Sequence, residues 1–521
     1  MSHTPNTTGP FVSVLVPTYN RRRYLAEALA SIVAQTYEHF EAIVINDGGV
    51  GVRDVVDGFA DPRLVLIDRA DNRGKAASLN EGLERARGTY VAYLDDDDLY
   101  YPHHLERLVE TLEGPTDCGV AYTDLYKAHC RIQPDGSRQV LGKVVNISRD
   151  FDRFFQCYFN HTLHVAAMHR RDLLERAGPY DESLGILVDW DLMRRLAFFT
   201  DFVHVPEVTG EFFAPVANSD RISEKGRGDR QVFMATVLKI RTARPPKPWP
   251  KMPDLSIVLL PETAEAAALM VRQVYAWTFV PHEIYLPMPQ ADLDRLGIRM
   301  PNFVPVPVEA GTSLAGRLDA AVARAGGDYV AVVPHGTPFH LVWVEDALHA
   351  ALAGDGRTAF ALGEDEPTPT TGFVLPTEVL ARVRRGAGGA PVAEALRAAG
   401  ITLRAPAPDE YALRFDRALQ EAQRRRDEGN PLQAAAIYAG VGEQLGNTRW
   451  MRECRAHTLY EAGGHDAGVL GLCRDLNRRP RVSTLLLEGR VLRRAGRFEE
   501  AVDRLEHARR LLAPQKGTPC N

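Results

Sequence analysis

Short apolar strands alternate with amphipathic helices over residues 12–105, and this alternation restricts the chain to few folds. Apolar runs and helical spacing predict, in chain order, a strand at 12–16, a helix at 25–35, strands at 41–45 and 64–67, a helix at 79–86 and a strand at 90–94. The alternation predicts an α/β fold with a mostly parallel sheet and flanking helices. Ligands of such a sheet are expected outside the carboxyl ends of its strands.

Three polar turns follow these strands and are expected to meet at one edge of the sheet. They are residues 17–20, residues 46–48 and a run of four aspartates at 95–98. Carboxylates at the carboxyl end of a strand suit a hard divalent cation and a phosphate-bearing ligand. The alternative is a solvated acidic turn without a ligand.

The composition restricts the partners of the chain. Among its 521 residues, 25% are charged, the net charge is -6 and no long basic run occurs, so nucleic acid is not expected as a partner. The first ten residues are polar, no apolar run is long enough to span a bilayer, and the six cysteines are scattered without metal-ligand spacing. These features predict a cytoplasmic protein without a transmembrane segment.

A proline-rich segment at residues 243–253 is predicted to link a first domain, residues 1–242, to a second α/β domain, residues 254–406. The pattern of the first domain returns after it, since LSIVL at 255–259 repeats VSVLV at 12–16. The four aspartates are replaced by the sequence PHGT, which includes His335. We interpret residues 254–406 as a degenerate copy that keeps the sheet without its chemistry. Chance similarity between two α/β domains is the alternative.

Residues 409–521 are predicted to form an all-α helical repeat with a period of about 34 residues. Glycines mark the matching turns and alanines follow them, namely Gly429, Gly463 and Gly496, then Ala434, Ala467 and Ala501. Small residues at fixed places let paired helices pack closely. Residues 487–501 resemble a tetratricopeptide repeat. Such stacks bind a protein partner or mediate self-association, or they serve as structural caps.

The first domain contains a set of short motifs in a fixed order. They are VLVPTYNR at 14–21, QTY at 35–37, FEAIVINDG at 40–48, LNEG at 79–82 and YLDDDD at 93–98. Together these motifs resemble the family 2 glycosyltransferases, inverting enzymes with the GT-A nucleotide-sugar-binding fold. The resemblance covers roughly residues 11–215. It implies transfer of one sugar from a nucleotide sugar to an acceptor hydroxyl.

The resemblance implies which residues bind the nucleotide sugar. The loop after the first strand lines the nucleotide pocket and consists of Pro17, Thr18, Tyr19 and Asn20. Asp47 accepts a hydrogen bond from the base, most simply from the imide NH of uracil, which favours a UDP-sugar. Arg73 and Lys75 are candidates to flank the base or the phosphates; a solvated cationic loop is the alternative.

The Asp-x-Asp motif of the family falls on Asp95, Asp96 and Asp97. By this resemblance Asp97 coordinates Mn²⁺ or Mg²⁺, and Asp95 or Asp96 holds the ribose or a metal-bound water. The cation offsets charge on the leaving diphosphate. Asp98 exceeds the motif and is interpreted as a cap of the helix that begins near Tyr101.

The segment LVDWDLMRRL at 187–196 resembles the part of the family that supplies the catalytic base. The base is then Asp189, although Val188 stands where a second acidic residue is common. Asp189 takes the proton of the acceptor hydroxyl as that oxygen attacks the anomeric carbon. Asp191 is interpreted as a helix cap, and helix capping is also the alternative for Asp189.

Three further residues are candidates for contact with the sugar or the acceptor, namely His161, His164 and Asp124. For the two histidines, packing in the core is the alternative. The acceptor is expected to be a glycan, a lipid-linked glycan or a protein.

Two other functions compete with sugar transfer. A nucleotidyltransferase would normally carry a glycine-rich basic loop after its first strand, whereas residues 17–23 contain no glycine. A non-catalytic adaptor would bind a sugar nucleotide or a glycan with its α/β domains and recruit partners through the helical repeats. The acidic cluster and Asp189 favour the enzyme over the adaptor.

Overall fold

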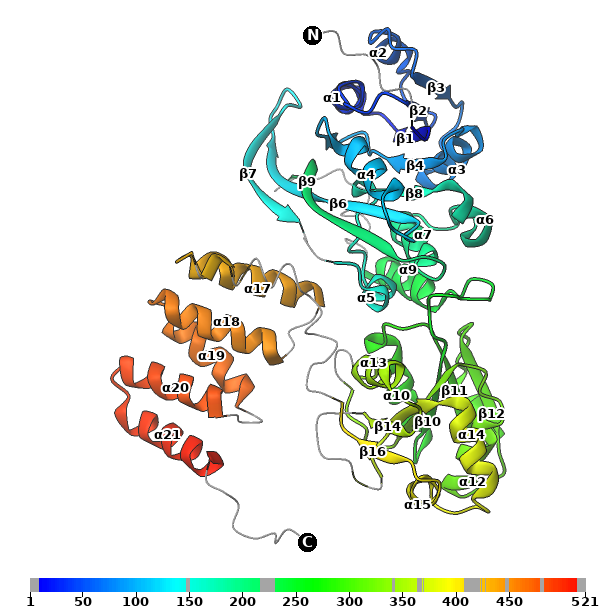
Figure 1. The fold of residues 1–521 in the computed structure, drawn as a ribbon, viewed down its shortest axis with the longest axis vertical. Coiled ribbons are helices and arrows are strands. Elements are labelled where there is room, and N and C mark those ends of the chain that lie inside the picture. The colour runs from blue at the N-terminus through cyan, green and yellow to red at the C-terminus, as the bar shows by residue number, and fades with distance from the viewer. Residues whose placement is uncertain are drawn as a thin grey trace. The chain divides into compact units, whose positions relative to one another are not determined.

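The computed structural model describes residues 9–146, 150–215, 230–339, 343–362, 368, 370–406, 422, 424–426, 428–445, 449–477 and 482–512. The chain divides into two compact units, Met1–Pro408 and Asp409–Asn521. The first unit contains two β-sheets and the second is built from helices (Figure 1). The domain boundaries within the first unit stay predictions.

The first sheet has the strand order β3-β2-β1-β4-β8-β6-β9-β5, and β7 pairs with β6. Its strands are β1 (Val12–Thr18), β2 (Phe40–Asn46), β3 (Leu64–Asp68), β4 (Tyr90–Tyr93), β5 (Leu99–Tyr100), β6 (Val120–Ile132), β7 (Arg138–Asn146), β8 (Ala167–Arg170) and β9 (Phe202–Pro215). Strands β1 to β4 are parallel, but β8 is antiparallel to both β4 and β6. The prediction of a mostly parallel sheet is confirmed for β1 to β4, and β6 and β9 also pair in parallel. The sheet is mixed because β5, β7 and β8 are antiparallel to their neighbours.

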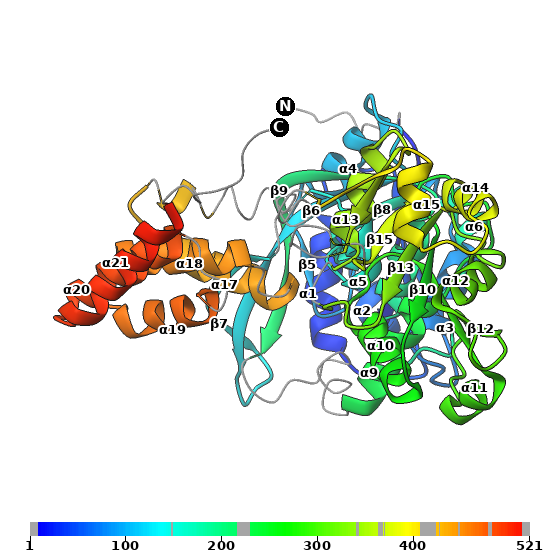
Figure 2. The same cartoon turned by 90° about the horizontal axis from the view of Figure 1, so that it is seen from below.

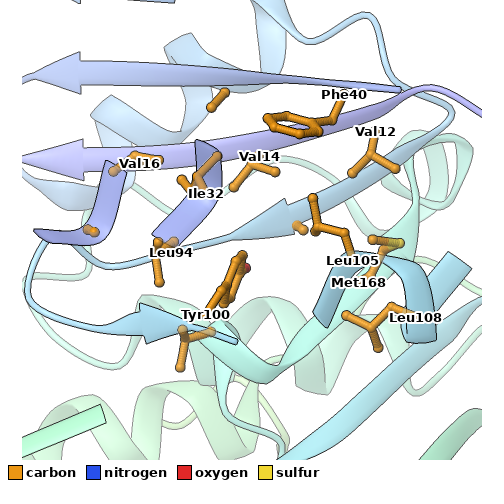
Figure 3. Close-up of a cluster of buried hydrophobic side chains, with 14 of the residues drawn as sticks. Val12, Val14, Val16, Ile32, Phe40, Leu94, Tyr100, Leu105, Leu108 and Met168 are labelled. Atoms are coloured by element: carbon orange, nitrogen blue, oxygen red, sulfur yellow. The ribbon is translucent and has the colours of Figure 1, made fainter. Parts of the chain in front are cut away.

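Helices cover both faces of the parallel half of this sheet. The helices of the region are α1 (Arg22–Val33), α2 (Arg53–Asp57), α3 (Lys75–Arg85), α4 (His104–Glu113), α5 (Arg153–Tyr158), α6 (Leu174–Ala177), α7 (Val188–Leu196) and α9 (Arg230–Thr242). Alternate residues of β1, such as Val12 and Val14, pack with α1 and α4 in one core (Figure 3). On the other face α3 lies so close that a Cβ at Gly82 would sit 3.0 Å from Ile45 Cδ1. The strands are apolar on both sides because both sides are covered.

The second sheet has the strand order β12-β11-β10-β13-β15-β14-β16. Its strands are β10 (Leu255–Leu260), β11 (His282–Met288), β12 (Phe303–Pro307), β13 (Tyr329–Pro334), β14 (Thr358–Ala361), β15 (Phe373–Pro376) and β16 (Thr402–Arg404). Its helices are α10 (Ala264–Trp277), α11 (Gln290–Leu296), α12 (Leu314–Val322), α13 (Glu345–Ala353), α14 (Thr377–Gly386) and α15 (Val392–Ala398). As in the first sheet, four parallel strands are followed by an antiparallel one, here β15.

The second unit is a run of neighbouring helices, each packed against the next (Figure 2). They are α17 (Pro431–Leu445), α18 (Arg449–Ala462), α19 (Asp466–Leu476), α20 (Val482–Arg494) and α21 (Phe498–Leu512). The predicted turn glycines Gly429, Gly463 and Gly496 have φ of 78°, 71° and 74°, which suits residues without a side chain.

The predicted role of small residues after these turns holds at two places. Ala434 and Ala501 are buried, whereas Ala467 is exposed, and the first buried residue of α19 is Val469. The first turn of α19 therefore does not make the close helix contact that the 34-residue period predicts. Within the described residues, no helix has both the length and the apolar character that crossing a bilayer requires.

Candidate active site

The predicted meeting of three polar turns is present at the carboxyl edge of the first sheet. Thr18, the last residue of β1, pairs with Asn46, the last residue of β2. Leu15 of β1 pairs with Tyr93, the last residue of β4. Because these strands are parallel, the loops that leave them emerge side by side.

Backbone geometry ties the loops after β1, β2 and β3 together. Asn20 adopts a left-handed conformation with φ of 59°, and its Oδ1 accepts a hydrogen bond of 2.8 Å from Val50 N. Gly48 has φ of 69°, and a Cβ there would overlap the backbone of Asp71. Tyr19 lies 47% exposed in this setting, so its ring is open to a ligand.

Asp47 is buried and holds the loop that precedes α3. Its two carboxylate oxygens accept hydrogen bonds from Arg73 N at 3.0 Å and Gly74 N at 2.8 Å. Arg69 adds an ion pair of 2.9 Å. The side chain of Arg73 is 60% exposed and pairs with Glu182 at 3.3 Å. The structure thus brings the backbone of Arg73, and not its side chain, to Asp47. A nucleotide base that donates to Asp47 would bond carboxylate oxygens that already accept hydrogen bonds from the backbone.

Asp96 points back toward the loop after β1. Its Oδ2 accepts a hydrogen bond of 2.8 Å from Thr18 Oγ1, and its Oδ1 pairs with Arg21 at 3.1 Å. Arg21 also pairs with Asp97 Oδ2 at 3.1 Å. Burial raises the pKa of Asp96, and the charge of Asp97 adds to this rise, although Arg21 and Thr18 oppose it. Asp96 therefore anchors the acidic turn to β1.

Asp95, Asp97 and Asp98 form the part of the turn that suits a cation. One carboxylate oxygen from each lies within 4.8 Å of the others. Hard divalent cations such as Mg²⁺ and Mn²⁺ prefer oxygen ligands of this kind. The predicted capping role of Asp98 is wrong: α4 begins at His104, and Asp98 Oδ1 instead accepts a 3.2 Å hydrogen bond from Phe213 N on β9.

Lys75 connects the acidic turn to the predicted base. It is the first residue of α3, and its Nζ lies 2.6 Å from Asp95 Oδ1. Burial lowers the pKa of Lys75, but the charges of Asp95, Asp189 and Asp97 outweigh it, and the pKa is raised. Lys75 is therefore a cation that pairs with Asp95, and the charge of Asp189 adds to the rise of its pKa.

Asp189 lies in the first turn of α7, which follows Leu187 in a left-handed conformation with φ of 61°. Asn160 Nδ2 donates a hydrogen bond of 2.9 Å to Asp189 Oδ2 and so orients the carboxylate. The predicted capping role of Asp191 is wrong, because no side chain caps α7 and Asp191 forms an ion pair of 2.8 Å with Arg195, one turn further on.

The two candidate histidines are buried among aromatic side chains. His164 Nε2 lies 2.6 Å from the hydroxyl of Tyr180, and its ring stacks on Tyr93 with centroids 3.7 Å apart. His161 packs against Phe155 with a centroid separation of 5.0 Å. These contacts fit the packing alternative, and contact with a sugar stays a prediction for both.

Asp124, the third such candidate, is buried on β6. Its Oδ1 lies 2.7 Å from His204 Nε2, and that histidine stacks on Tyr122. The contact joins β6 to β9, and a role of Asp124 in sugar binding stays a prediction.

The sequence patterns assign no role to three residues of the site, namely Arg21, Arg69 and Asn160. Arg21 directly follows the turn after β1, and Arg69 directly follows β3. Their places after strands were a usable signal. No comparable sequence signal marks Asn160, because its partner Asp189 lies 29 residues later in the chain.

Comparison with known proteins finds similarity to glycosyltransferases over part of the chain. Residues 13–176 match the model of the family described as Glycosyl transferase family 2. An uncharacterized glycosyltransferase of Rickettsia typhi is 30% identical over 195 residues, which is 36% of this chain and 58% of the relative. A Bacillus subtilis glycosyltransferase named for teichuronic acid biosynthesis is 35% identical over 117 residues, which is 22% of this chain and 46% of that relative. The chain thus spans about half the length of these two relatives.

Solved structures also resemble part of the chain. A mannosyltransferase of Pyrobaculum calidifontis in complex with GDP-Man and Mn²⁺ gives a TM-score of 0.34 at 23% identity, covering 47% of this chain and 68% of that one. Residues 1–349 of S. aureus TarS in complex with UDP give a TM-score of 0.34 at 17% identity, covering 44% and 64%.

Proposed function

We propose that the protein is an inverting, metal-dependent glycosyltransferase with a GT-A fold, which the match of residues 13–176 to the family 2 glycosyltransferase model supports. It moves one sugar from a nucleotide sugar, a UDP-sugar being favoured, to an acceptor hydroxyl. The single observation that carries the proposal is the convergence of one carboxylate oxygen each from Asp95, Asp97 and Asp98 within 4.8 Å of one another, with Lys75 Nζ 2.6 Å from Asp95 Oδ1.

The donor binds at the carboxyl edge of the first sheet. Thr18 ends β1, Tyr19 and Asn20 follow it on the loop, and Asp47 directly follows β2. Tyr19 offers an exposed ring for the base, and Asp47 offers a carboxylate oxygen to a base N–H.

Asp95, Asp97 and Asp98 fit a divalent cation, Mn²⁺ or Mg²⁺, because their oxygens converge. A bound cation supplies Lewis-acid stabilisation of the leaving diphosphate. Lys75 and Arg21 hold the turn through Asp95, Asp96 and Asp97, and they offset part of the negative charge of these aspartates.

Asp189 acts as the general base. Asn160 occupies Oδ2 of Asp189 and orients the carboxylate toward its substrate. As the acceptor oxygen bonds to the anomeric carbon, its proton passes to Asp189 and the bond to the diphosphate breaks on the opposite face. The diphosphate leaves with the electron pair, and the configuration inverts.

We assign supporting roles to the other two parts of the chain. The second sheet is a degenerate copy of the first, an interpretation supported by its strand order and directions. The C-terminal helices are tetratricopeptide-like repeats that bind a protein partner or mediate self-association, supported by three glycine turns. The acceptor is a glycan, a lipid-linked glycan or a protein, and the reaction takes place in the cytoplasm.

The test combines turnover with metal-dependent donor binding. Purified protein with Mn²⁺ and a panel of nucleotide sugars should release nucleoside diphosphate from one of them. Asp97→Asn should abolish metal-dependent UDP binding in calorimetry, because a carboxylate ligand of the cation is lost.

Asp117→Asn is the matched control, since Asp117 is exposed and lies far along the chain from the acidic turn. Metal-dependent UDP binding unchanged in Asp97→Asn would contradict the metal site. If no donor is turned over and a partner protein binds instead, the adaptor function replaces the enzyme.

A further inference from the structure

The β6–β7 hairpin, in cyan in Figure 1, is anchored to helix α1 by its tip. Arg23 Nη1 donates a hydrogen bond of 2.7 Å to Asp135 O, and the hydroxyl of Tyr24 donates one of 3.1 Å to Gly136 O. Both donors belong to the second and third residues of α1. The hairpin therefore has a defined position against the helix that follows the nucleotide loop.

Arg138, the first residue of β7, connects the hairpin to the buried interior. Its side chain is only 5% exposed. The guanidinium lies over the ring of Phe213 at 3.5 Å and over the ring of Tyr24 at 4.6 Å, and it forms an ion pair with Glu27. A planar guanidinium between two aromatic faces and a carboxylate has little freedom to turn.

The remaining contact of Arg138 is with the acidic turn itself. Its Nη1 donates a hydrogen bond of 2.6 Å to the main-chain oxygen of Asp97. Phe213, which stacks on Arg138, donates its own N–H to Asp98 Oδ1 at 3.2 Å. The turn is thus held at two points: the Arg138 side chain bonds its main chain, and the main-chain N–H of Phe213 bonds the Asp98 carboxylate.

We propose that Arg138 is a positioning residue of the metal site and that the β6–β7 hairpin holds it in place. The proposal rests on the function proposed above, in which Asp97 is a ligand of the cation. A charged donor on the Asp97 carbonyl sets where that residue's carboxylate projects. Groups one step behind a ligand typically change metal affinity by about 10- to 100-fold when removed.

A purely structural arginine would change the melting temperature and leave the affinity of the folded protein for metal unchanged. The two properties are measured separately on the full chain. Mn²⁺ is titrated by calorimetry in the presence of UDP, and thermal melts are recorded without metal.

Arg138→Ala is expected to weaken Mn²⁺ binding by about 10-fold or more. The Mn²⁺ affinity of Arg138→Lys should lie between those of the wild type and Arg138→Ala. The lysine ammonium can still reach a carbonyl but has no planar face to stack. Arg131→Ala is the matched control: Arg131 is exposed on the same hairpin, next to the residue that pairs with Arg138. It should bind Mn²⁺ as the wild type does.

Wild-type Mn²⁺ affinity in folded Arg138→Ala would overturn this inference and leave the proposed function standing. Absence of Mn²⁺ binding by the wild-type protein would overturn both. If Arg138→Ala does not fold, Arg138→Lys and Tyr24→Phe decide. Tyr24→Phe removes only the hydroxyl that anchors Gly136 and should weaken binding by roughly 3-fold. Unchanged affinity in both variants would overturn the inference.

Discussion

The two sheets of the first unit share an architecture down to single hydrogen bonds. In each, strand order and direction agree, with β15, β14 and β16 in the places of β8, β6 and β9. Gly88 N donates to Ser13 Oγ at 2.8 Å, and Gly327 N donates to Ser256 Oγ at 3.0 Å. A Cβ at either glycine would lie within 2.8 Å of the backbone nitrogen of that serine. Both sheets therefore need glycine just before the fourth strand.

The sheets differ at the carboxyl edge, where the first one carries its acidic residues. The turn after β13 contains His335 in place of aspartates, and α12 begins with Leu314 where α3 begins with Lys75. The second residue of α7 is Asp189, whereas the second residue of α15 is Ala393. The comparison teaches that the packing of such a sheet is independent of the chemistry at its edge.

The largest expected effect is on turnover, at Asp189, where the corresponding helix of the second sheet has Ala393. Asp189→Asn should lower turnover by about 10²- to 10⁴-fold, because the amide cannot take the acceptor proton. UDP binding should persist, since Asp189 lies outside the nucleotide loops. Steady-state kinetics and calorimetry on the same preparation measure the two quantities.

Glu394→Gln, the neighbouring position of the corresponding helix α15, serves as the control and should leave turnover unchanged. Native turnover in Asp189→Asn would show that another group removes the proton.

An effect of intermediate size is expected on stability, at a contact that both sheets share. In the first sheet it joins the end of α1 to α4, and in the second it joins the end of α10 to α13. Gln35 Oε1 accepts from Leu105 N in the first sheet, whereas Glu345 Oε1 accepts from Phe279 N and Val280 N in the second. Burial raises the pKa of Glu345 to about 7. The folded state thus keeps a proton that the unfolded state loses above its ordinary pKa of 4.5, and stability falls as pH rises between these values.

Glu345→Gln keeps the accepting oxygen and removes the titration. We expect the melting temperature of the wild type to decline between pH 5 and pH 8 by a few degrees more than that of the variant, about 2–4 °C per kcal/mol. Glu378→Gln, on the exposed side of α14, is the control. Parallel curves for wild type and Glu345→Gln would exclude this titration as a source of the pH dependence.

The smallest expected effect sharpens the comparison. His335→Ala changes the turn that takes the place of the four aspartates, and we expect turnover and UDP affinity equal to those of the wild type. A loss of 10-fold or more would mean that the second sheet contributes to the reaction and is more than a degenerate copy.

The fold of the parallel half and much of the site were predictable because their signals are local. Strands β1 to β4 are apolar runs. Asp47 directly follows β2 and the aspartates at 95–98 come shortly after β4, so parallel geometry brings them to the same edge. Asp98 and Asp191 were assigned wrongly for the same reason. Each was assigned to the helix end closest in sequence, but Asp98 bonds a strand more than a hundred residues later and Asp191 pairs one turn along its own helix.

The alternation of strands and helices, the glycine turns and the short motifs after the strands could all be read from the amino-acid sequence, because each depends on residues near one another in the chain. Only the tertiary structure decided which side chains hold the acidic residues in place. Asn160 reaches Asp189 across 29 residues and Arg138 reaches Asp97 across 41, and no local pattern encodes such pairs. They form because packing of the mixed sheet and its hairpin brings distant polar groups into contact, where each must find a partner.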